Sequence, residues 1–301
     1  MRQFDVVVGN PPFQDSSHSE KKNTLWRKFL ELSVEQLVKK DGYLAFITPS
    51  SWAGSAKLLN KFFLPNNIIA LNKDECRRHF PGVGSTFSYF IVQLAPYGNT
   101  TWVKNVQLNG DVVTSTINLL DVLHGVFPRD LSIEGVSIVK KVFNPNHPKL
   151  GVINACTHHN VKRNRFQKQQ EGKFKYPIQN TPSSTYWYDT PHPHQGVPKI
   201  AIPTSTYYKR MLITTHGVTQ GLCYFLIPDG VDPEIALHNV NNKLFDYVNE
   251  CFRYANWNSV PVLRELPSVP FKRKLTDIDI YKHFKLTASE IKLIEDTVSW
   301  R

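Results

Sequence analysis

The residues best suited to chemistry form the segment Asn10-Pro11-Pro12-Phe13, which we call the NPPF motif and which directly follows the apolar run 5–9. The two prolines fix φ and favour extended backbone before them, so the motif is expected to be a stiff loop at a strand end. The Asn10 amide and the neighbouring backbone carbonyls offer hydrogen-bond acceptors, and the Phe13 ring can stack on a heterocycle. Together they predict a pocket for the exocyclic amine of a nucleobase.

An NPPF motif after a strand resembles the catalytic motif of amino-group DNA methyltransferases, which act on adenine N6 or, less often, on cytosine N4. The resemblance implies that the Asn10 side chain and the Pro11 carbonyl accept hydrogen bonds from the target amine. The nitrogen lone pair then stays available to attack the methyl group of S-adenosylmethionine, while Phe13 stacks on the base. The expected catalytic residues are therefore Asn10, Pro11, Pro12 and Phe13.

The next ninety residues alternate between helical and extended patterns. Apolar spacing predicts helices over 25–40 and 54–64, and strands over 43–48, 68–71 and 85–94. Strands separated by helices are typical of a parallel α/β sheet whose ligand crevice lies beyond the carboxyl ends of the strands. We therefore expect a partial Rossmann-like methyltransferase sheet, with Asn10 and Ser50 on one rim.

Two of these segments carry the same resemblance. The string DGYLAFITPSSW at 41–52 is similar to the methyltransferase segment after the catalytic motif, and FPGVGSTFSYFIV at 80–92 resembles the loop and strand that close the target-base pocket. We expect Phe87 or Tyr89 to supply a second aromatic face for the base. The alternative is that both are ordinary strand residues that pack against a helix. The combination resembles the large adenine-specific methylases of type IIG restriction-modification proteins, which carry a C-terminal recognition domain.

The cofactor region is the missing part of this resemblance. In the family a glycine-rich loop precedes the catalytic motif, together with an acidic residue that binds the ribose, whereas only residues 1–4 precede the first strand here. Gly82 and Gly84 lack the strand, turn and helix context of such a loop. The resemblance therefore implies S-adenosylmethionine as cofactor, with the main binding motif absent from this chain and supplied by a partner.

Three explanations of this pattern stay open. The chain is half of a split enzyme, a degenerate relative that binds nucleic acid without catalysis, or a fragment. A parallel sheet without its first strands would expose an apolar edge, so we expect a partner subunit or self-association. The intact NPPF motif favours the split enzyme.

Composition agrees with a nucleic-acid-binding protein. The 301 residues carry a formal charge of +11 and are 41% hydrophobic, which favours a polyanionic partner such as double-stranded DNA, although solubility alone also explains the charge. No apolar run reaches the 18 residues or so of a membrane span. The four cysteines are scattered without a CxxC pair, which argues against zinc and disulfides and for a cytoplasmic location.

A Pro/Gly/Asn stretch at 95–101 predicts a boundary between the catalytic part, residues 1–100, and a mixed α+β target-recognition domain, residues 101–301. Basic side chains in the second part are candidates for DNA contacts. They are Lys162, Arg163, Arg165, Lys168, Lys209 and Arg210. The alternative for the first four residues is a solvated loop. For the last two, the aromatic run beside them is the kind of segment that more often packs in a core.

Other patterns in the second part concern its fold. Strands are expected at 211–215 and 222–227, joined by a tight connection, and a helix over 233–254. Thr287 with Glu290 predicts a capping box at the start of a last helix, and this ending resembles that of target-recognition domains. Adjacent His158 and His159 lack an evident third ligand, so no metal site is expected.

Two hypotheses follow. One is a site-specific adenine-N6 DNA methyltransferase, or the catalytic and recognition part of a split one, that acts on a flipped adenine. The other is a methyltransferase-like DNA-binding protein that has lost cofactor binding. Clustered carboxylates with a lysine, as nucleases need, do not stand out. The recognition sequence and the choice between adenine and cytosine stay open.

Overall fold

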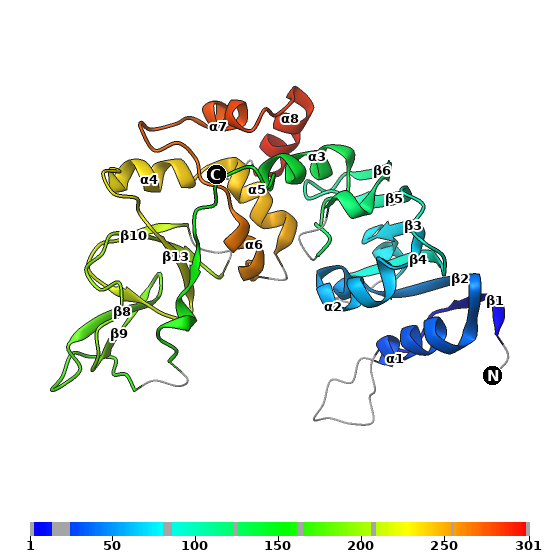
Figure 1. Ribbon diagram of the computed structural model, residues 1–301, viewed down its shortest axis with the longest axis horizontal. Helices are drawn as coiled ribbons and strands as arrows, with labels where there is room; N and C mark the ends of the chain where they lie inside the picture. Colours follow the sequence, from blue (N-terminus) through cyan, green and yellow to red (C-terminus); the bar gives the residue numbers. More distant parts are fainter. Residues whose placement is uncertain are drawn as a thin grey trace. The chain divides into compact units, whose positions relative to one another are not determined.

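The computed structural model describes residues 3–13, 25–80, 86–122, 126–161, 165–205, 209–253 and 256–298. The chain divides into two compact units, Met1–Ser137 and Ile138–Arg301 (Figure 1). Each unit has its own sheets and helices. The NPPF motif belongs to the first.

The first unit is built on one six-stranded sheet in the order β1-β2-β4-β3-β5-β6. Its strands are β1 (Phe4–Gly9), β2 (Val38–Pro49), β3 (Asn67–Lys73), β4 (Phe87–Gln93), β5 (Thr101–Val106) and β6 (Val112–Ile117). Strands β1 and β2 are parallel, as are β3 and β5, whereas β4 is antiparallel to both β2 and β3. The carboxyl ends of β1, β2, β3 and β5 therefore lie at one edge of the sheet, which we call the carboxyl edge.

The expectation of an all-parallel sheet is wrong at β4. The chain leaves β3 through the short 3-10 helix η4 (Glu75–His79), and no crossover helix lies among the described residues between β3 and β4. A parallel neighbour needs a crossover, whereas a short turn returns the chain antiparallel. The fold is accordingly mixed α/β with a mixed sheet.

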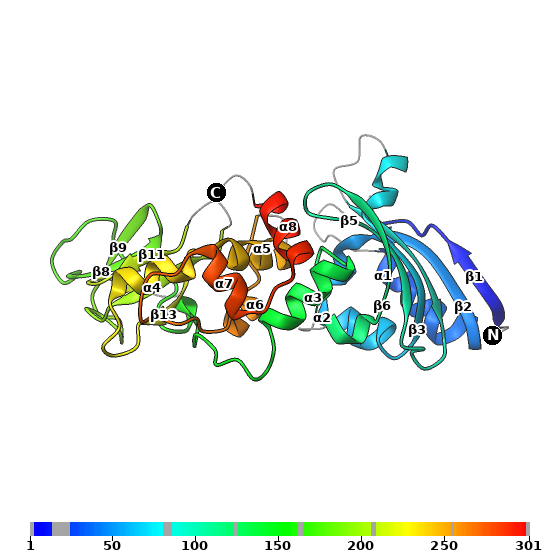
Figure 2. The same ribbon diagram turned by 90° about the horizontal axis from the view of Figure 1, so that it is seen from above.

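Helical segments between the strands pack on one face of this sheet. They are α1 (Leu25–Leu32), η1 (Ser33–Leu37), η2 (Ser50–Gly54), α2 (Ala56–Leu58) and η3 (Leu59–Phe63). Figure 2 shows α1 and α2 on the same side of the curved sheet. The helix expected over 25–40 ends early, because Val38 is already extended and pairs with Phe4 in the β1–β2 ladder. The segment expected over 54–64 is helical.

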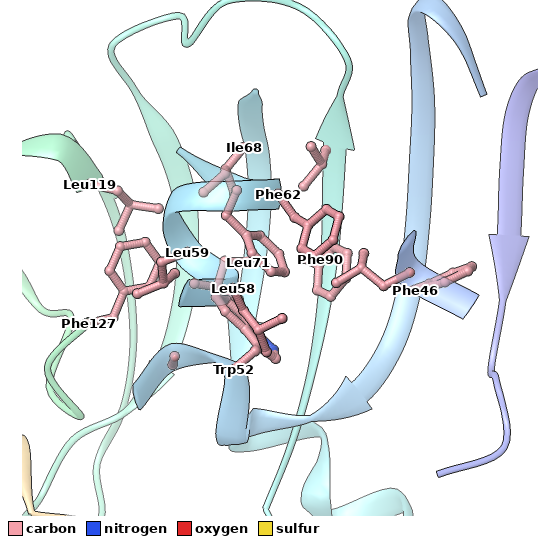
Figure 3. Packing of buried hydrophobic residues seen from close by; sticks show 14 of the residues in the cluster. Phe46, Trp52, Leu58, Leu59, Phe62, Ile68, Leu71, Phe90, Leu119 and Phe127 are labelled. Atoms are coloured by element: carbon pink, nitrogen blue, oxygen red, sulfur yellow. The ribbon is translucent and has the colours of Figure 1, made fainter. Parts of the chain in front are cut away.

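The core of the first unit forms between these helices and the sheet (Figure 3). The Trp52 ring stacks on Phe63 at 4.2 Å between centroids and meets Phe90 edge-on at 5.7 Å. Such pairs add about 0.5–1.5 kcal/mol each beyond area burial. Because Trp52 follows Ser50 by two residues, this packing also fixes the chain just after β2, at the carboxyl edge.

The sheet continues past the expected domain boundary at residue 100. Strand β5 begins at Thr101 and pairs with β3, and β6 pairs with β5. The 3-10 helix η5 (Leu119–Val122) follows, and Leu119 is part of the same core. The compact unit therefore extends to Ser137, because the Pro/Gly/Asn stretch at 95–101 is a turn within the sheet.

The second unit contains two small sheets, ordered β11-β10-β13-β7 and β12-β8-β9. The strands are β7 (Ile153–Asn154), β8 (Tyr176–Thr181), β9 (Ser184–Tyr188), β10 (Lys199–Pro203), β11 (Met211–Ile213), β12 (Gly217–Val218) and β13 (Leu222–Leu226), with the 3-10 helix η6 (Ala155–Thr157) after β7. Strands form where they were expected, but β11 and β13 do not pair with each other. Strand β10 lies between them and pairs antiparallel with both.

Helices complete the second unit, beginning with α3, which runs across the sequence boundary between the units. They are α3 (Ile133–Val142), α4 (Pro233–Val240), α5 (Lys243–Phe252), α6 (Val260–Glu265), α7 (Asp277–His283) and α8 (Ala288–Thr297). The helix expected over 233–254 is broken, because Asn242 leaves helical geometry and caps α5 by accepting from the Phe245 N–H. The capping box of Thr287 and Glu290 is confirmed. No helix among the described residues is long and apolar enough to cross a membrane.

Candidate functional site

The NPPF motif lies at the carboxyl edge of the first sheet, directly after β1. Gly9 pairs with Phe46 of β2, so the motif begins beside the last residues of β2. A Cβ on Gly9 would come within 3.1 Å of the Phe46 ring, so glycine allows the strand end to approach closely. Asn10 is exposed, and its side chain makes no hydrogen bond to another described residue. No described residue therefore competes with a ligand for its amide.

The rest of the motif is anchored in the protein. Pro11 is buried, Pro12 is exposed, and Phe13 is half-buried against the core of the first unit. This alternation gives the motif a fixed side and a solvent-facing side. Because Pro12 follows it, Pro11 is confined to extended ψ values, so the Pro11 carbonyl beside Asn10 has a restricted direction.

Phe87, expected as an aromatic face of the pocket, packs directly against Phe13. Their ring centroids are 5.2 Å apart at an interplanar angle of 33°, and Phe87 stacks on Phe80 at 4.6 Å. A base sandwiched between two rings would separate their centroids by about 7 Å, which is two van der Waals contacts. In this arrangement Phe87, 1% exposed, supports the Phe13 ring from behind and leaves no room for a base between them.

Tyr89, the other expected aromatic, lies further from the motif. It is half-buried on β4 and pairs with Ile47 of β2 and Asn72 of β3. Because β2 separates β4 from β1, Tyr89 lies two strand spacings, about 10 Å, from the line of β1. It is a sheet-face residue in this structure, which agrees with the ordinary-strand alternative.

A buried hydrogen-bond network lies behind the carboxyl edge. The Ser50 hydroxyl donates to Asp74 Oδ1 at 2.6 Å and lies 2.7 Å from the Ser88 hydroxyl. Lys73 Nζ donates to Asp74 Oδ2 at 3.0 Å and to the Arg129 carbonyl at 3.1 Å. The network ties together the ends of β2 and β3 and the start of β4.

The neighbouring Lys73 ammonium favours the ionised form of Asp74. Burial alone would raise the pKa of this carboxyl, but the Lys73 ammonium and the Ser50 hydrogen bond outweigh it and hold the pKa below its ordinary value. Asp74 also has a left-handed backbone, with φ of +69°. A charged, hydrogen-bonded carboxylate thus fixes the turn that leads from β3 back to β4 and Phe87.

The network belongs to a row of buried polar residues that crosses the sheet. Thr48, Ser88, Lys73 and Asn105 are successive partners on β2, β4, β3 and β5. All four are buried, and Thr48 Oγ1 and both side-chain amide atoms of Asn105 have no hydrogen-bond partner among the described residues. Sequence reasoning placed Ser50 on the rim but missed Lys73 and Asp74, although two charged residues directly after an apolar strand were the available signal.

The candidate DNA contacts of the second unit fall into different environments. Lys162 and Arg163 lie outside the described residues. Arg165, Lys168 and Lys209 are exposed. The Arg165 guanidinium lies 5.9 Å from the centroid of the Phe174 ring.

The expectation that Arg210 contacts DNA is wrong. Its side chain is buried, forms an ion pair with Asp246 at 2.9 Å and lies over the Phe245 ring. A guanidinium held in this way does not face solvent and cannot contact a DNA phosphate.

The second unit contains a histidine cluster that was not predicted from the sequence. The His158 ring lies 5.1 Å from His192 and 5.6 Å from His194, and His194 Nδ1 lies 2.8 Å from the Tyr224 hydroxyl. Burial, with neighbouring His159, lowers the pKa of His192 to about 3. The described residues contain no group of three or more His, Cys, Asp or Glu side chains that could hold a metal. The tertiary fold alone brings these histidines together.

The described strand ends do not form a cradle for S-adenosylmethionine. At the carboxyl edge β1, β2 and β3 lead into Asn10-Pro11, Ser50-Ser51 and Asp74-Glu75, and none of these described turns is rich in glycine. They offer acceptors for an amine but not the close backbone approach that a glycine-rich cofactor loop provides. The turns after β1, β2 and β3 therefore do not supply that backbone approach by themselves.

Comparison with known proteins gives one family match. Residues 1–74 match the family model described as Eco57I restriction-modification methylase. This range contains the NPPF motif and reaches from β1 to Asp74. Comparison with curated protein sequences gives no match.

Solved structures give further likenesses. The type IIL restriction-modification enzyme MmeI in complex with DNA has a TM-score of 0.43 and 9% identity, over 98% of this chain and 53% of that chain. The DrdV–DNA complex has a TM-score of 0.42 and 12% identity, over 88% and 42%. A structure from Listeria monocytogenes, described as a class I S-adenosylmethionine-dependent methyltransferase, has a TM-score of 0.25 and 19% identity. The match covers 32% of this chain and 33% of that chain.

The chain spans between about a quarter and a half of the solved structures it resembles, from 24% for a type I restriction-modification system to 53% for MmeI. The part of the chain that carries the NPPF motif, residues 1–74, is thus similar to the Eco57I restriction-modification methylases.

Proposed function

We propose that the chain is the catalytic-motif and recognition part of a site-specific DNA adenine-N6 methyltransferase of the restriction-modification type. The observation that carries this proposal is the exposed Asn10 amide at the carboxyl end of β1, which makes no hydrogen bond to another described residue and is followed by Pro11 and Phe13. The motif lies within the 74 residues that match the methylase family. S-adenosylmethionine is the methyl donor, and the second unit reads the DNA target.

The residues of the motif act on a flipped adenine. The Asn10 side-chain oxygen and the Pro11 carbonyl each accept a hydrogen bond from one N–H of the N6 amine. These two hydrogen bonds direct the nitrogen lone pair away from the ring system. Phe13 offers one face of its ring to the base, and Phe87 fixes that ring from behind. Extrusion of a base costs a few kcal/mol, which this stacking and these hydrogen bonds offset.

The network behind the motif has a positioning role. Ser50 and Asp74 hold the turn that leads into β4, and Asp74 accepts a hydrogen bond from Ser50 while its backbone N–H donates to the Phe87 carbonyl at 3.0 Å. Phe87 in turn supports Phe13. A rigid wall behind the stacking ring keeps the base aligned with Asn10.

Exposed basic residues of the second unit contact the DNA backbone. Arg165, Lys168 and Lys209 are exposed, and we include Lys162 and Arg163 from the same basic segment on sequence grounds. Arg210 is left out because it is buried against Asp246. The net charge of +11 favours double-stranded DNA as the partner.

The cofactor is proposed to bind mainly to a second polypeptide, because the described strand ends of this chain form no cradle for it. The enzyme is accordingly a split one, with the methyl donor on one subunit and the amine-binding motif on the other. Among restriction-modification proteins adenine N6 is preferred over cytosine N4 here because the motif and its neighbours resemble the adenine-specific methylases.

The test is methyl transfer from labelled S-adenosylmethionine to unmethylated DNA, with the chain alone and with extract from its source. The proposal predicts label in DNA that is lost at least 1000-fold in Asn10→Ala but kept in Asn146→Ala, which removes another exposed asparagine. Tight, salt-sensitive DNA binding with no transfer under any condition would instead leave a non-catalytic DNA-binding protein.

A further inference from the structure

The histidine cluster of the second unit, made up of His158, His159, His192 and His194, lies where the two small sheets meet. His158 and His159 follow β7 and η6 of the four-stranded sheet. His192 and His194 lie in the loop that leads from β9 of the three-stranded sheet to β10 of the other. Figure 1 shows β8 and β9 at one end of the second unit, away from α5 and α6.

Each of the two sheets supplies a ring that contacts the cluster. The His159 ring stacks on Tyr188 of β9, with centroids 4.6 Å apart and an interplanar angle of 13°. On the other side, His194 Nδ1 lies 2.8 Å from the hydroxyl of Tyr224 on β13. The His192 ring lies 5.5 Å from His159 and 5.8 Å from His194, so it links these two contacts. The cluster therefore joins the three-stranded sheet to the four-stranded one.

The hydrogen bonds of His192 determine where this ring carries its proton. Its Nδ1 accepts from the His194 backbone N–H at 3.0 Å, so the neutral ring is protonated on Nε2. Nε2 is buried and has no hydrogen-bond partner among the described residues, and a Cβ on Gly217 of β12 would lie only 2.4 Å from the His192 Cβ. A second proton could enter only at Nδ1, where it would face the His194 N–H and break their hydrogen bond. Protonation of His192 is therefore incompatible with the folded loop.

Protonation of His159 is also opposed by its surroundings. Its Nδ1 lies 3.2 Å from the His158 carbonyl and donates to it, which leaves Nε2 as the position for a second proton. That Nε2 atom is buried without a hydrogen-bond partner in the described part of the chain. A new N–H there would place a charge in a buried position without an acceptor. Burial accordingly lowers the pKa of His159, His192 and His194.

The other titratable groups beside the cluster bring no negative charge to offset a proton. Among the described residues these groups are Tyr188, Tyr224, Lys199 and His216. Lys199 of β10 is buried and donates to the His216 carbonyl at 2.9 Å. The acidic residue nearest to His192 in sequence, Asp189, pairs with Lys173. A positive charge on one histidine is therefore opposed by Lys199 and by any second protonated ring.

We propose that the histidine cluster is an acid-sensitive latch between the two small sheets. When pH falls, proton uptake by His192 and His159 separates the three-stranded sheet from the four-stranded one. The basic segment after the cluster moves with β9, because Gln167 and Trp187 exchange two backbone hydrogen bonds, at 2.9 and 2.8 Å. The position of exposed Arg165 thereby depends on pH.

The direction and size of the effect follow from proton uptake. In the open form the histidines titrate near their ordinary pKa of about 6.5, whereas in the closed form they stay neutral. The latch is therefore fully stabilised above about pH 6.5 and weakens as pH falls below it. Between about pH 7.5 and about pH 5.5, each such histidine raises the equilibrium constant for opening about tenfold, so His192 and His159 together raise it about 100-fold.

The test is amide hydrogen exchange of the full chain at these two pH values, read by mass spectrometry and corrected for the intrinsic pH dependence of exchange. For peptides that cover Gln167 and residues 176–188, we expect the opening constant to rise about 100-fold. Peptides over β2 and β4 should change less than about threefold, because they belong to the other unit. His192→Asn keeps an acceptor for the His194 N–H but does not titrate, so its rise should be about tenfold. His238→Asn is the matched control, because His238 is exposed on α4 of the same unit, and it should keep the full rise.

The native chain is measured first, so a variant that does not fold leaves the test in place. His159→Gln is the second variant, with the same expected loss as His192→Asn. A rise below about tenfold in the native chain would overturn the inference. An equal rise in peptides over β10 and β13 would also overturn it, because the whole unit would then open. The same holds for a full rise that persists in both His192→Asn and His159→Gln.

Discussion

Replacement of Ser50 by alanine tests whether the buried network stabilises the carboxyl edge. The variant removes the donor at 2.6 Å from Asp74 Oδ1 and the hydroxyl 2.7 Å from Ser88, while Lys73 still pairs with Oδ2. Hydrogen bonds to charged groups contribute about 1.5–3 kcal/mol, and a surviving ion pair places the loss near the middle, at about 2 kcal/mol. With a urea dependence of about 2 kcal/mol per molar, the midpoint falls by about 1 M.

The assay is urea unfolding at pH 7 followed by tryptophan fluorescence, since buried Trp52 lies two residues from Ser50. The adjacent Ser51→Ala is the matched control, because the Ser51 side chain has no hydrogen bond to a described residue. Asp74→Asn, alone and with Ser50→Ala, completes a double-mutant cycle, for which coupling of at least about 1 kcal/mol is expected.

The stability that Asp74 contributes should also depend on pH in a known direction. The pKa of Asp74 is lowered in the folded protein, so its contribution is present above the ordinary aspartate pKa and is lost as pH falls through the folded value. The gap between wild type and Ser50→Ala should therefore be widest near pH 7 and narrow below about pH 4. Equal midpoints for Ser50→Ala and Ser51→Ala, or strictly additive effects with Asp74→Asn, would show that the Ser50–Asp74 hydrogen bond does not stabilise the carboxyl edge.

Three further outcomes follow from the second unit. Burial lowers the pKa of His192 to about 3, so the unfolded state binds a proton that the folded state does not. The free energy of unfolding should therefore fall by about 1.4 kcal/mol per pH unit as pH drops from about 6.5 toward 3. His192→Asn should reduce this pH dependence, measured by urea titrations at several pH values. Arg210→Ala should destabilise the unit by about 3–5 kcal/mol, because it removes the guanidinium that faces the buried Asp246 carboxylate; an unchanged melting curve would contradict that role. The double variant Arg165→Ala with Lys168→Ala should lower the slope of log K for DNA binding against log salt concentration by the equivalent of about two phosphate contacts, without a change in stability. An unchanged slope would exclude both residues from the DNA interface.

Much of the first unit could be predicted because strand patterns are local. Apolar runs gave β1, β3 and β4 to within a few residues, and the position of the NPPF motif at a strand end follows from proline chemistry alone. The direction of β4 was not predicted, because antiparallel pairing depends on how the chain turns through η4. The extent of the unit was also missed, since the turn at 95–101 looks the same whether or not β5 rejoins the sheet.

Side-chain partnerships were the harder part of the site. Arg210 and Lys209 are adjacent in sequence, yet one is buried with Asp246 on α5 and the other is exposed. The Phe13–Phe87 contact joins residues 74 positions apart, and the histidine cluster joins His158 to His192. Contacts of this kind are made by the tertiary fold, so residue type and spacing cannot specify them.

The central claim is that Asn10 positions an adenine amine for methyl transfer. The most direct measurement is mass spectrometry of nucleosides from DNA incubated with S-adenosylmethionine, the chain and extract from its source. We expect N6-methyladenine with the native chain and none with Asn10→Ala, at unchanged DNA affinity. N6-methyladenine formed equally well by Asn10→Ala, or a methyl group found only on cytosine, would contradict the account.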